Sequence, residues 1–250
     1  MKLPLMISDS SGNILYSDRS ITVSSALRLF ASSAAKSNKN GILYWQGKAV
    51  YTKEVVLCGE KFRFFMDSER ICECLGIEAS MLGNDLFDLP KTFKNRITVP
   101  LKSLVLLFAD AFSKELYDAG IRLSVRGILS EQTVNVSPSA FAMCLALMTR
   151  LCANNASAVT LTFANECGRI SIYADSTGGA PIETKAKEVL QMLLYEIGAQ
   201  AGFAVDKTVR AGKASFTLSL EPLDISLIGL KVPSLDRYAK IFELYIKFFL

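Results

Sequence analysis

The sequence contains no histidine, and this absence removes several kinds of chemistry at once. No side chain can act as an imidazole base, bind a metal through imidazole or carry a phosphate on an imidazole nitrogen. Runs of like charge are also missing, because the 28 basic and 24 acidic residues are scattered along the chain. Without a basic stretch the chain offers no electrostatic footprint for nucleic acid, so we expect no nucleic-acid partner.

The chain also lacks the cysteine spacing of a zinc site or a disulfide framework. Its six cysteines form no CxxC pair and mostly lie in apolar stretches, so we expect reduced, buried thiols and no metal. No apolar run is long enough to span a bilayer, and the one in MKLPLMISDSSGN is too short for a signal peptide. We therefore expect a cytoplasmic protein without a membrane span.

Half of the 250 residues are apolar, so the chain can bury a sizeable core. At the amino terminus, LPLMISD and NILYSD flank the turn residues Ser11, Gly12 and Asn13, which predicts a β-hairpin. SSALRLFASSAA has helical periodicity, and GILYW, AVYTKEVVLC and KFRFFMD predict an antiparallel meander. Residues 1–77 are therefore expected to form a small mixed α/β module.

The same module is rich in strand aromatics that have two interpretations. Trp45, Tyr44, Phe62, Phe64 and Phe65 could line a ligand cavity, but aromatic residues on strands more often form ordinary core. We favour the core.

Residues 78–120 combine a connector with a long helix. Gly83 and Pro90 interrupt the connector, Glu78 to Arg96, so we expect broken helical pieces and a domain boundary there. Pro100 stands where a first helical turn would begin, and apolar residues then recur at helical spacing from Leu101 to Leu116. Because the helix is apolar on more than one side, it is either an ordinary buried helix or a dimer interface.

Residues 121–222 alternate strands and helices. IRLSV is strand-like, and Ser137 followed by Pro138 predicts the start of a helix that runs to about Ala153. AVTLTF and RISIYAD predict a hairpin that delivers Asp175 to the loop STGGAPI. A second helix is expected from Thr184 to Gln200, followed by a closing hairpin of FAVDKTV and ASFTLSL. Residues 223–250 predict an extension with an apolar helix.

The order helix, strand, helix, two strands, helix, two strands, from Leu101 to Pro222, resembles the ATP-binding domain of sensor histidine kinases and their gyrase, Hsp90 and MutL relatives, known as GHKL or Bergerat-fold ATPases. VSPSAFAMCLALMTRLCANNASAVTLTF is similar to the asparagine-box helix and its following strand, and GRISIYADSTGGAPI to the first glycine box. The resemblance implies an α+β protein whose carboxyl-terminal half is a two-layer α/β sandwich. The amino-terminal module is similar in element order to a PAS domain.

The resemblance also implies a site, and the chain departs from the family pattern there. Asp175 matches the aspartate that accepts a hydrogen bond from adenine, and Gly179 matches the last glycine, but Thr177 replaces the middle one. Arg150 stands where the family's asparagine holds Mg²⁺, and a guanidinium has no acceptor to offer a metal. A shifted alignment would use Asn154 or Asn155.

The second glycine box of the family falls near residues 184–188, which read Thr-Lys-Ala-Lys-Glu without a glycine. Such a lid has lost the positive-φ freedom and close backbone approach used to hold phosphates. The resemblance therefore implies a catalytically inactive, histidine kinase-like signalling protein that acts by protein contacts, with no catalytic residue, cofactor or metal. Its expected partners are a histidine kinase, a response regulator or a second copy joined through Leu101–Asp118.

A second hypothesis is that the chain still binds a nucleotide. Here the chain is a switch that binds ATP or ADP without hydrolysis or phosphotransfer. Arg150, together with Lys185 or Lys187, would replace Mg²⁺ as the counter-charge of the phosphates, while Asp175 holds adenine.

Overall fold

The computed structural model describes residues 5–17, 21–82, 93, 95–118, 120–127, 132–152, 157–166, 169–177, 185–210, 213–223, 234–235, 238–239 and 242–243. The chain divides into two compact units. The first comprises Met1–Asp88 and Thr184–Leu193, and the second comprises Leu89–Glu183 and Leu194–Leu250. None of the helices in the described residues is both long and apolar enough to cross a lipid bilayer.

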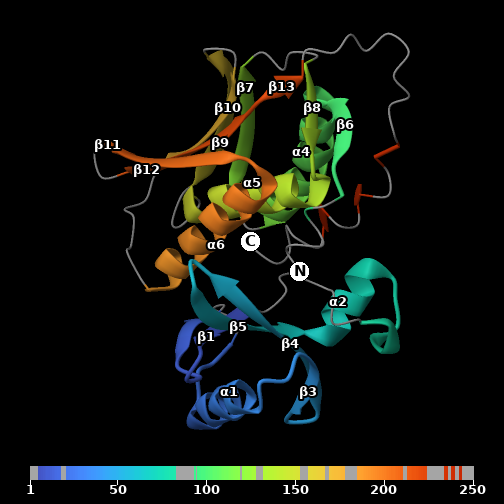
Figure 1. The fold of residues 1–250 in the computed structure, drawn as a ribbon, viewed down its shortest axis with the longest axis vertical. Helices are drawn as coiled ribbons and strands as arrows, with labels where there is room; N and C mark the ends of the chain where they lie inside the picture. Colours follow the sequence, from blue (N-terminus) through green and yellow to red (C-terminus); the bar gives the residue numbers. More distant parts are fainter. Residues whose placement is uncertain are drawn as a thin grey trace. The chain divides into compact units, whose positions relative to one another are not determined.

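The first unit contains a five-stranded antiparallel sheet in the order β2-β1-β5-β4-β3 (Figure 1). Its strands are β1 (Leu5–Asp9), β2 (Ile14–Ser17), β3 (Gly41–Trp45), β4 (Lys48–Leu57) and β5 (Glu60–Asp67). The predicted hairpin and meander are both confirmed. The carboxylate of Asp9 shapes the hairpin turn, because its Oδ1 accepts from the backbone N–H groups of Ser11 and Asn13 at 2.9 and 2.8 Å.

Helix α1 (Ser25–Ser37) packs on one face of this sheet. Its N-cap is Ser24, whose side chain accepts from the N–H of Leu27 at 3.2 Å. Three buried residues of the helix, Leu27, Ala31 and Ala34, form an apolar cluster with two residues of the sheet, Met6 and Phe65. Phe30 extends the cluster toward Trp45, with ring centroids 6.2 Å apart.

A buried arginine of the sheet forms hydrogen bonds with the residues that follow α1. Arg63 on β5 is 2% exposed, and its guanidinium donates to the carbonyl of Lys39 at 2.6 Å and to Asn38 Oδ1 at 3.2 Å. It also donates to Thr52 Oγ1 and lies 3.5 Å from a carboxylate oxygen of Glu54. Burial lowers the pKa of Arg63, and the nearby Glu54 opposes that shift. These polar partners offset the desolvation of the cation.

The aromatic residues of the module do not share one face. Phe65 and Trp45 pack with α1, whereas Phe62 and Phe64 alternate with Phe65 along β5 and are buried on the opposite face. Tyr44 is 76% exposed. The expectation of ordinary core is therefore confirmed for the three phenylalanines, and Tyr44 belongs to the surface.

One helix after β5 was not predicted, namely α2 (Ser68–Leu75), whereas the 3₁₀ helix η1 (Ala79–Met81) is a helical piece of the kind expected in the connector. The Asp67 side chain caps α2 by accepting from the N–H groups of Glu69 and Arg70, and Gly76 ends the helix at φ 65°. An aspartate followed nine residues later by glycine is a helix signal that the strand pattern of KFRFFMD concealed.

The second unit begins with a small sheet. It has the order β13-β8-β6 and is built from β6 (Ile97–Pro100), β8 (Thr133–Val136) and β13 (Pro222–Leu223). Helix α4 (Leu101–Asp118) follows β6 directly, so Pro100 ends a strand and does not open the helix as expected. Backbone pairing between Pro100 and Thr133 accounts for the difference, because it extends the strand to the residue before the helix.

The larger sheet of this unit has the order β11-β12-β10-β9-β7 (Figure 1). Its strands are β7 (Arg122–Gly127), β9 (Ala158–Glu166), β10 (Arg169–Thr177), β11 (Ala204–Arg210) and β12 (Lys213–Leu220). β7 runs parallel to β9, and the other neighbours are antiparallel. With α5 (Pro138–Cys152) and α6 (Lys185–Ala201), the predicted order of elements and the α+β class are confirmed.

Two further features complete the second unit. The guanidinium of Arg96 donates to the carbonyl of Ala201 at the end of α6, where Gly202 takes up the expected left-handed conformation at φ 76°. Of the predicted carboxyl-terminal helix, residues 238–239 and 242–243 are helical and include the buried Tyr238 and Phe242, whereas Ser234 and Leu235 are not helical. The remainder of that prediction lies outside the described residues.

Candidate functional site

The candidate site lies where β10 ends. Along β10 the side chains alternate, with Ile170, Ile172 and Ala174 fully or almost fully buried. Cross-strand neighbours extend this apolar face, since Ala174 pairs with Leu161 on β9 and with Phe216 on β12. Helix α5 contacts β10 and β12 and covers this face.

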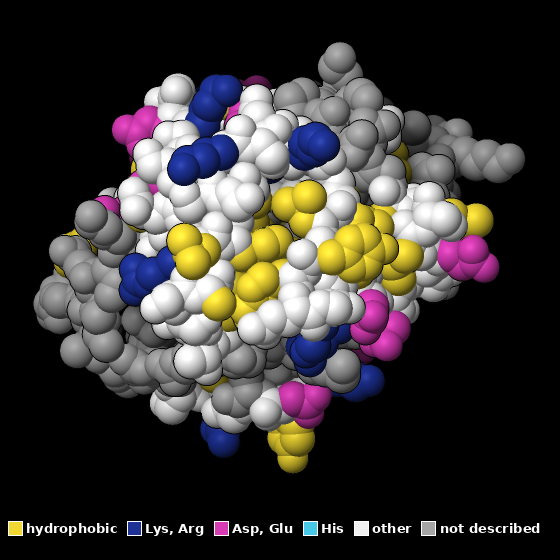
Figure 2. Space-filling model, turned by 90° about the horizontal axis from the view of Figure 1, so that it is seen from below, with side chains coloured by type: hydrophobic (Ala, Val, Ile, Leu, Met, Phe, Trp, Pro, Cys, Tyr) yellow, Lys and Arg dark blue, Asp and Glu magenta, His cyan; other side chains and the backbone are white. Residues whose placement is uncertain are grey.

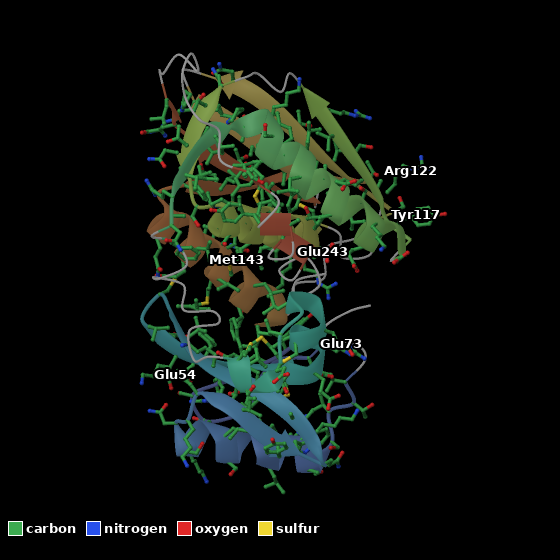
Figure 3. All side chains as sticks on the ribbon, turned by 90° about the vertical axis from the view of Figure 1, so that its right-hand side faces the viewer. Glu54, Glu73, Tyr117, Arg122, Met143 and Glu243 are labelled. Atoms are coloured by element: carbon green, nitrogen blue, oxygen red, sulfur yellow. The ribbon has the colours of Figure 1, made fainter. Side chains whose placement is uncertain are left out.

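Helix α5 is a core helix along its whole length. Ser137 caps its start, and its Oγ accepts from the N–H of Ala140 at 3.3 Å while Pro138 occupies the first helical position. Every residue of the helix except Arg150 is buried, including Met143, which Figure 3 labels. Burial raises the pKa of the Cys144 thiol well above its usual range, so this cysteine stays protonated.

Hydrogen bonds tie the end of α5 and the segment after it to the end of β10. Cys152 Sγ donates to the carbonyl of Ala174 at 3.0 Å. Both the N–H and the hydroxyl of Ser157 donate to the carbonyl of Thr177 at 3.2 Å.

The structure places Asp175 and Thr177 on the face of β10 opposite Ala174. Asp175 pairs with Thr160, and both Asp175 and Thr177 are exposed. Because successive side chains of a strand point to opposite faces, the residue that follows Ala174 on the α5 side is the half-buried Ser176. Asp175 therefore leaves the sheet on the side away from α5 and Arg150.

The lid segment of the resemblance is helical as far as it is described. Lys185 to Glu188 form the first turn of α6, with Glu188 as its acidic residue. Lys187 is half-buried and belongs to the first unit, whereas Arg150 and Asp175 belong to the second. Gly179 lies outside the described residues, as do Asn154 and Asn155 of the shifted alignment.

One buried polar atom near the site has no hydrogen-bond partner. Thr149 Oγ1, next to Arg150, is buried and forms no hydrogen bond with any residue that the structure describes. Among the residues that the structure describes, no three carboxylates and thiols gather closely enough to hold a metal ion.

A comparison with protein-family models and with curated proteins finds no match. Solved structures of histidine kinases do match. The catalytic domain of histidine kinase ThkA matches at 11% identity and a TM-score of 0.42, covering 51% of this chain and 95% of that one. The cytoplasmic segment of histidine kinase QseC matches at 12% identity and 0.40, covering 62% and 93%. Histidine kinase AdeS from Acinetobacter baumannii matches at 13% identity and 0.41, covering 62% and 75%.

Sequence reasoning missed three residues at this place, namely Thr149, Cys152 and Ser176. The alternation in RISIYAD could have predicted the direction of Ser176. Ile170, Ile172 and Ala174 are the apolar residues of the strand, so Ser176, two residues further on, must point to the same buried face. No sequence signal distinguishes the thiol of Cys152, which bonds to β10, from the other buried cysteines.

Proposed function

We propose that this chain is a histidine kinase-like signalling protein that has lost catalysis and acts through protein contacts. The observation that carries this proposal is the helical conformation of Lys185–Glu188, where the resemblance expects a flexible glycine lid. A helical first turn cannot take up the positive-φ conformations of such a lid.

Two further observations support the loss of catalysis. The chain has no histidine to accept a phosphoryl group. Arg150, at the end of a fully packed core helix, offers no oxygen to Mg²⁺. The apolar framework around it is intact, since its neighbours Leu151 and Cys152 are both 4% exposed. A scaffold retained without its chemical groups suits a protein that is recognised by others.

Helix α4 is the contact surface that we propose for a second copy of the chain. Leu106 is 55% exposed and Tyr117 is 83% exposed. Eleven residues separate them, which places both on nearly the same side of the helix. Tyr117 projects from the carboxyl end of α4 beside Arg122 at the start of β7, as Figure 3 shows. Two exposed apolar groups on one stripe can bury surface in a dimer.

Calorimetric titration with ATP and ADP, with and without Mg²⁺, tests the loss of catalysis. We expect no binding at millimolar nucleotide and no phosphate release. Magnesium-independent binding that Asp175→Asn abolishes would instead support the nucleotide switch. Magnesium-dependent turnover would contradict both hypotheses.

Light scattering of the full chain tests the contact surface. We expect a dimer that Leu106→Glu converts to a monomer, because a charge would be buried between the two copies. The matched control is Val209→Glu, since Val209 is 60% exposed on β11 and its substitution should leave the dimer unchanged. A monomeric wild-type chain that captures neither a histidine kinase nor a response regulator would contradict the proposal.

A further inference from the structure

Helix α1 carries an unusual surface on the side away from its sheet. Leu27, Ala31 and Ala34 face the core, whereas Leu29 points outward and is 73% exposed. Lys36 lies seven residues after Leu29 and therefore shares this outward ridge. An apolar side chain and a cation thus stand together on the most projecting part of the first unit.

Aromatic residues continue this surface toward β3. Phe30 is half-buried on the flank of α1 and contacts Trp45, whose ring is also half-buried. Lys48 pairs with Trp45 across the β3–β4 turn and is exposed on the same face of the sheet. Figure 2 looks onto this end of the unit and shows hydrophobic side chains near its middle, with Lys and Arg side chains and also Asp and Glu side chains around them.

The charges on helix α1 itself have one sign. Helix α1 contains Arg28 and Lys36 and no acidic residue. Glu54 lies on the α1 side of the sheet, but it is 3.1 Å from Lys61 and 3.5 Å from Arg63 and so is already neutralised. A second copy of the same surface would bring cations together, whereas an anionic occupant would complement them.

We propose that the α1 face of the first unit docks on an anionic phospholipid surface. A projecting leucine beside aromatic rings and flanking cations can sink into the boundary between headgroups and acyl chains, while a protein partner would need a groove to receive the ridge. Each basic residue near an anionic surface strengthens binding by roughly fivefold. The proposal is independent of the loss of catalysis and of the α4 contact.

The chain contains a single tryptophan, Trp45, which makes it a built-in probe of this surface. The full chain is mixed with vesicles of phosphatidylcholine alone, or with about a third phosphatidylglycerol. We expect a blue shift of the Trp45 emission and co-sedimentation with the anionic vesicles only, both reversed by salt. Equal binding to neutral vesicles, or none to anionic vesicles at low salt, would overturn the proposal.

Matched variants locate the contact. Arg28→Glu combined with Lys36→Glu should weaken binding by about tenfold or more, and Leu29→Asp by a similar factor. Met81→Asp is the control, because Met81 is 67% exposed in the same unit but outside α1 and β3. Circular dichroism checks that each variant is folded. If Leu29→Asp binds as the wild type does, or if only an acidic peptide shifts the Trp45 emission, the membrane assignment is wrong.

Discussion

Helices α1 and α5 differ in how much of their surface lies in the interior. In α5 every residue except Arg150 is buried, whereas α1 buries only Leu27, Ala31 and Ala34. The composition of the two helices already differs, because α1 has four serines and two basic residues among 13 residues, whereas α5 has one serine, one threonine and one arginine among 15. The spacing of the apolar residues differs as well, since it is periodic in α1 and almost continuous in α5.

The comparison indicates where the chain can change without losing its fold. Residues of α5 are constrained by close packing, and Arg150 is the residue of this helix whose side chain reaches the surface. Residues on the outer ridge of α1 carry no such constraint. The apolar and cationic side chains there are consequently better evidence of function than those of α5.

The largest expected effect comes from truncating the core of α5. Phe141 is fully buried, so Phe141→Ala should lower the free energy of unfolding by about 3–5 kcal/mol through lost contacts and a cavity. Urea unfolding followed by far-ultraviolet circular dichroism measures the change. Leu29→Ala on α1 is the control and should shift stability by no more than about 0.5 kcal/mol. Comparable losses in the two variants would contradict the contrast between the helices.

Much of this contrast could be predicted from the sequence. The Ser137-Pro138 start of α5, the periodicity of α1 and the long helix α4 all carry local signals, and the structure confirms them. Strands β6 and β13 carry none, because four-residue and two-residue strands exist only through pairing with the distant β8. A local sequence pattern cannot predict pairing between strands that lie far apart in the sequence.

The candidate site was only partly predictable for the same reason. The motif drew attention to Asp175, but the function of a strand residue depends on the face to which it points. That face is fixed by Ala174 and its partners Leu161 and Phe216 on two other strands. The contact of Cys152 with Ala174 likewise depends on how α5 packs, which no local pattern specifies.

A smaller effect is expected at the junction of α5 and β10. Cys152→Ala removes the thiol that donates to the Ala174 carbonyl and should destabilise the chain by about 2 kcal/mol, since the lost hydrogen bond adds to the small cavity that the buried thiol leaves. Cys152→Ser retains a donor and should recover part of the loss. Cys58→Ala is the control, because Cys58 is exposed and outside the core. Thermal unfolding of the three variants measures these differences, and an unchanged midpoint for Cys152→Ala would argue against the junction.

The smallest effects are expected at the helix caps, where the two helices can be compared with one substitution. Ser24→Ala should cost about 0.5–1 kcal/mol, because water can replace the lost bond to Leu27 at the exposed start of α1. Ser137→Ala should cost more, about 1–1.5 kcal/mol, since Ser137 is 1% exposed and the N–H of Ala140 would lose its partner in the interior. Asparagine or aspartate at position 24 should restore the α1 cap. Equal costs at the two caps, measured by urea unfolding, would show that burial does not distinguish the starts of these helices, even though it distinguishes their interiors.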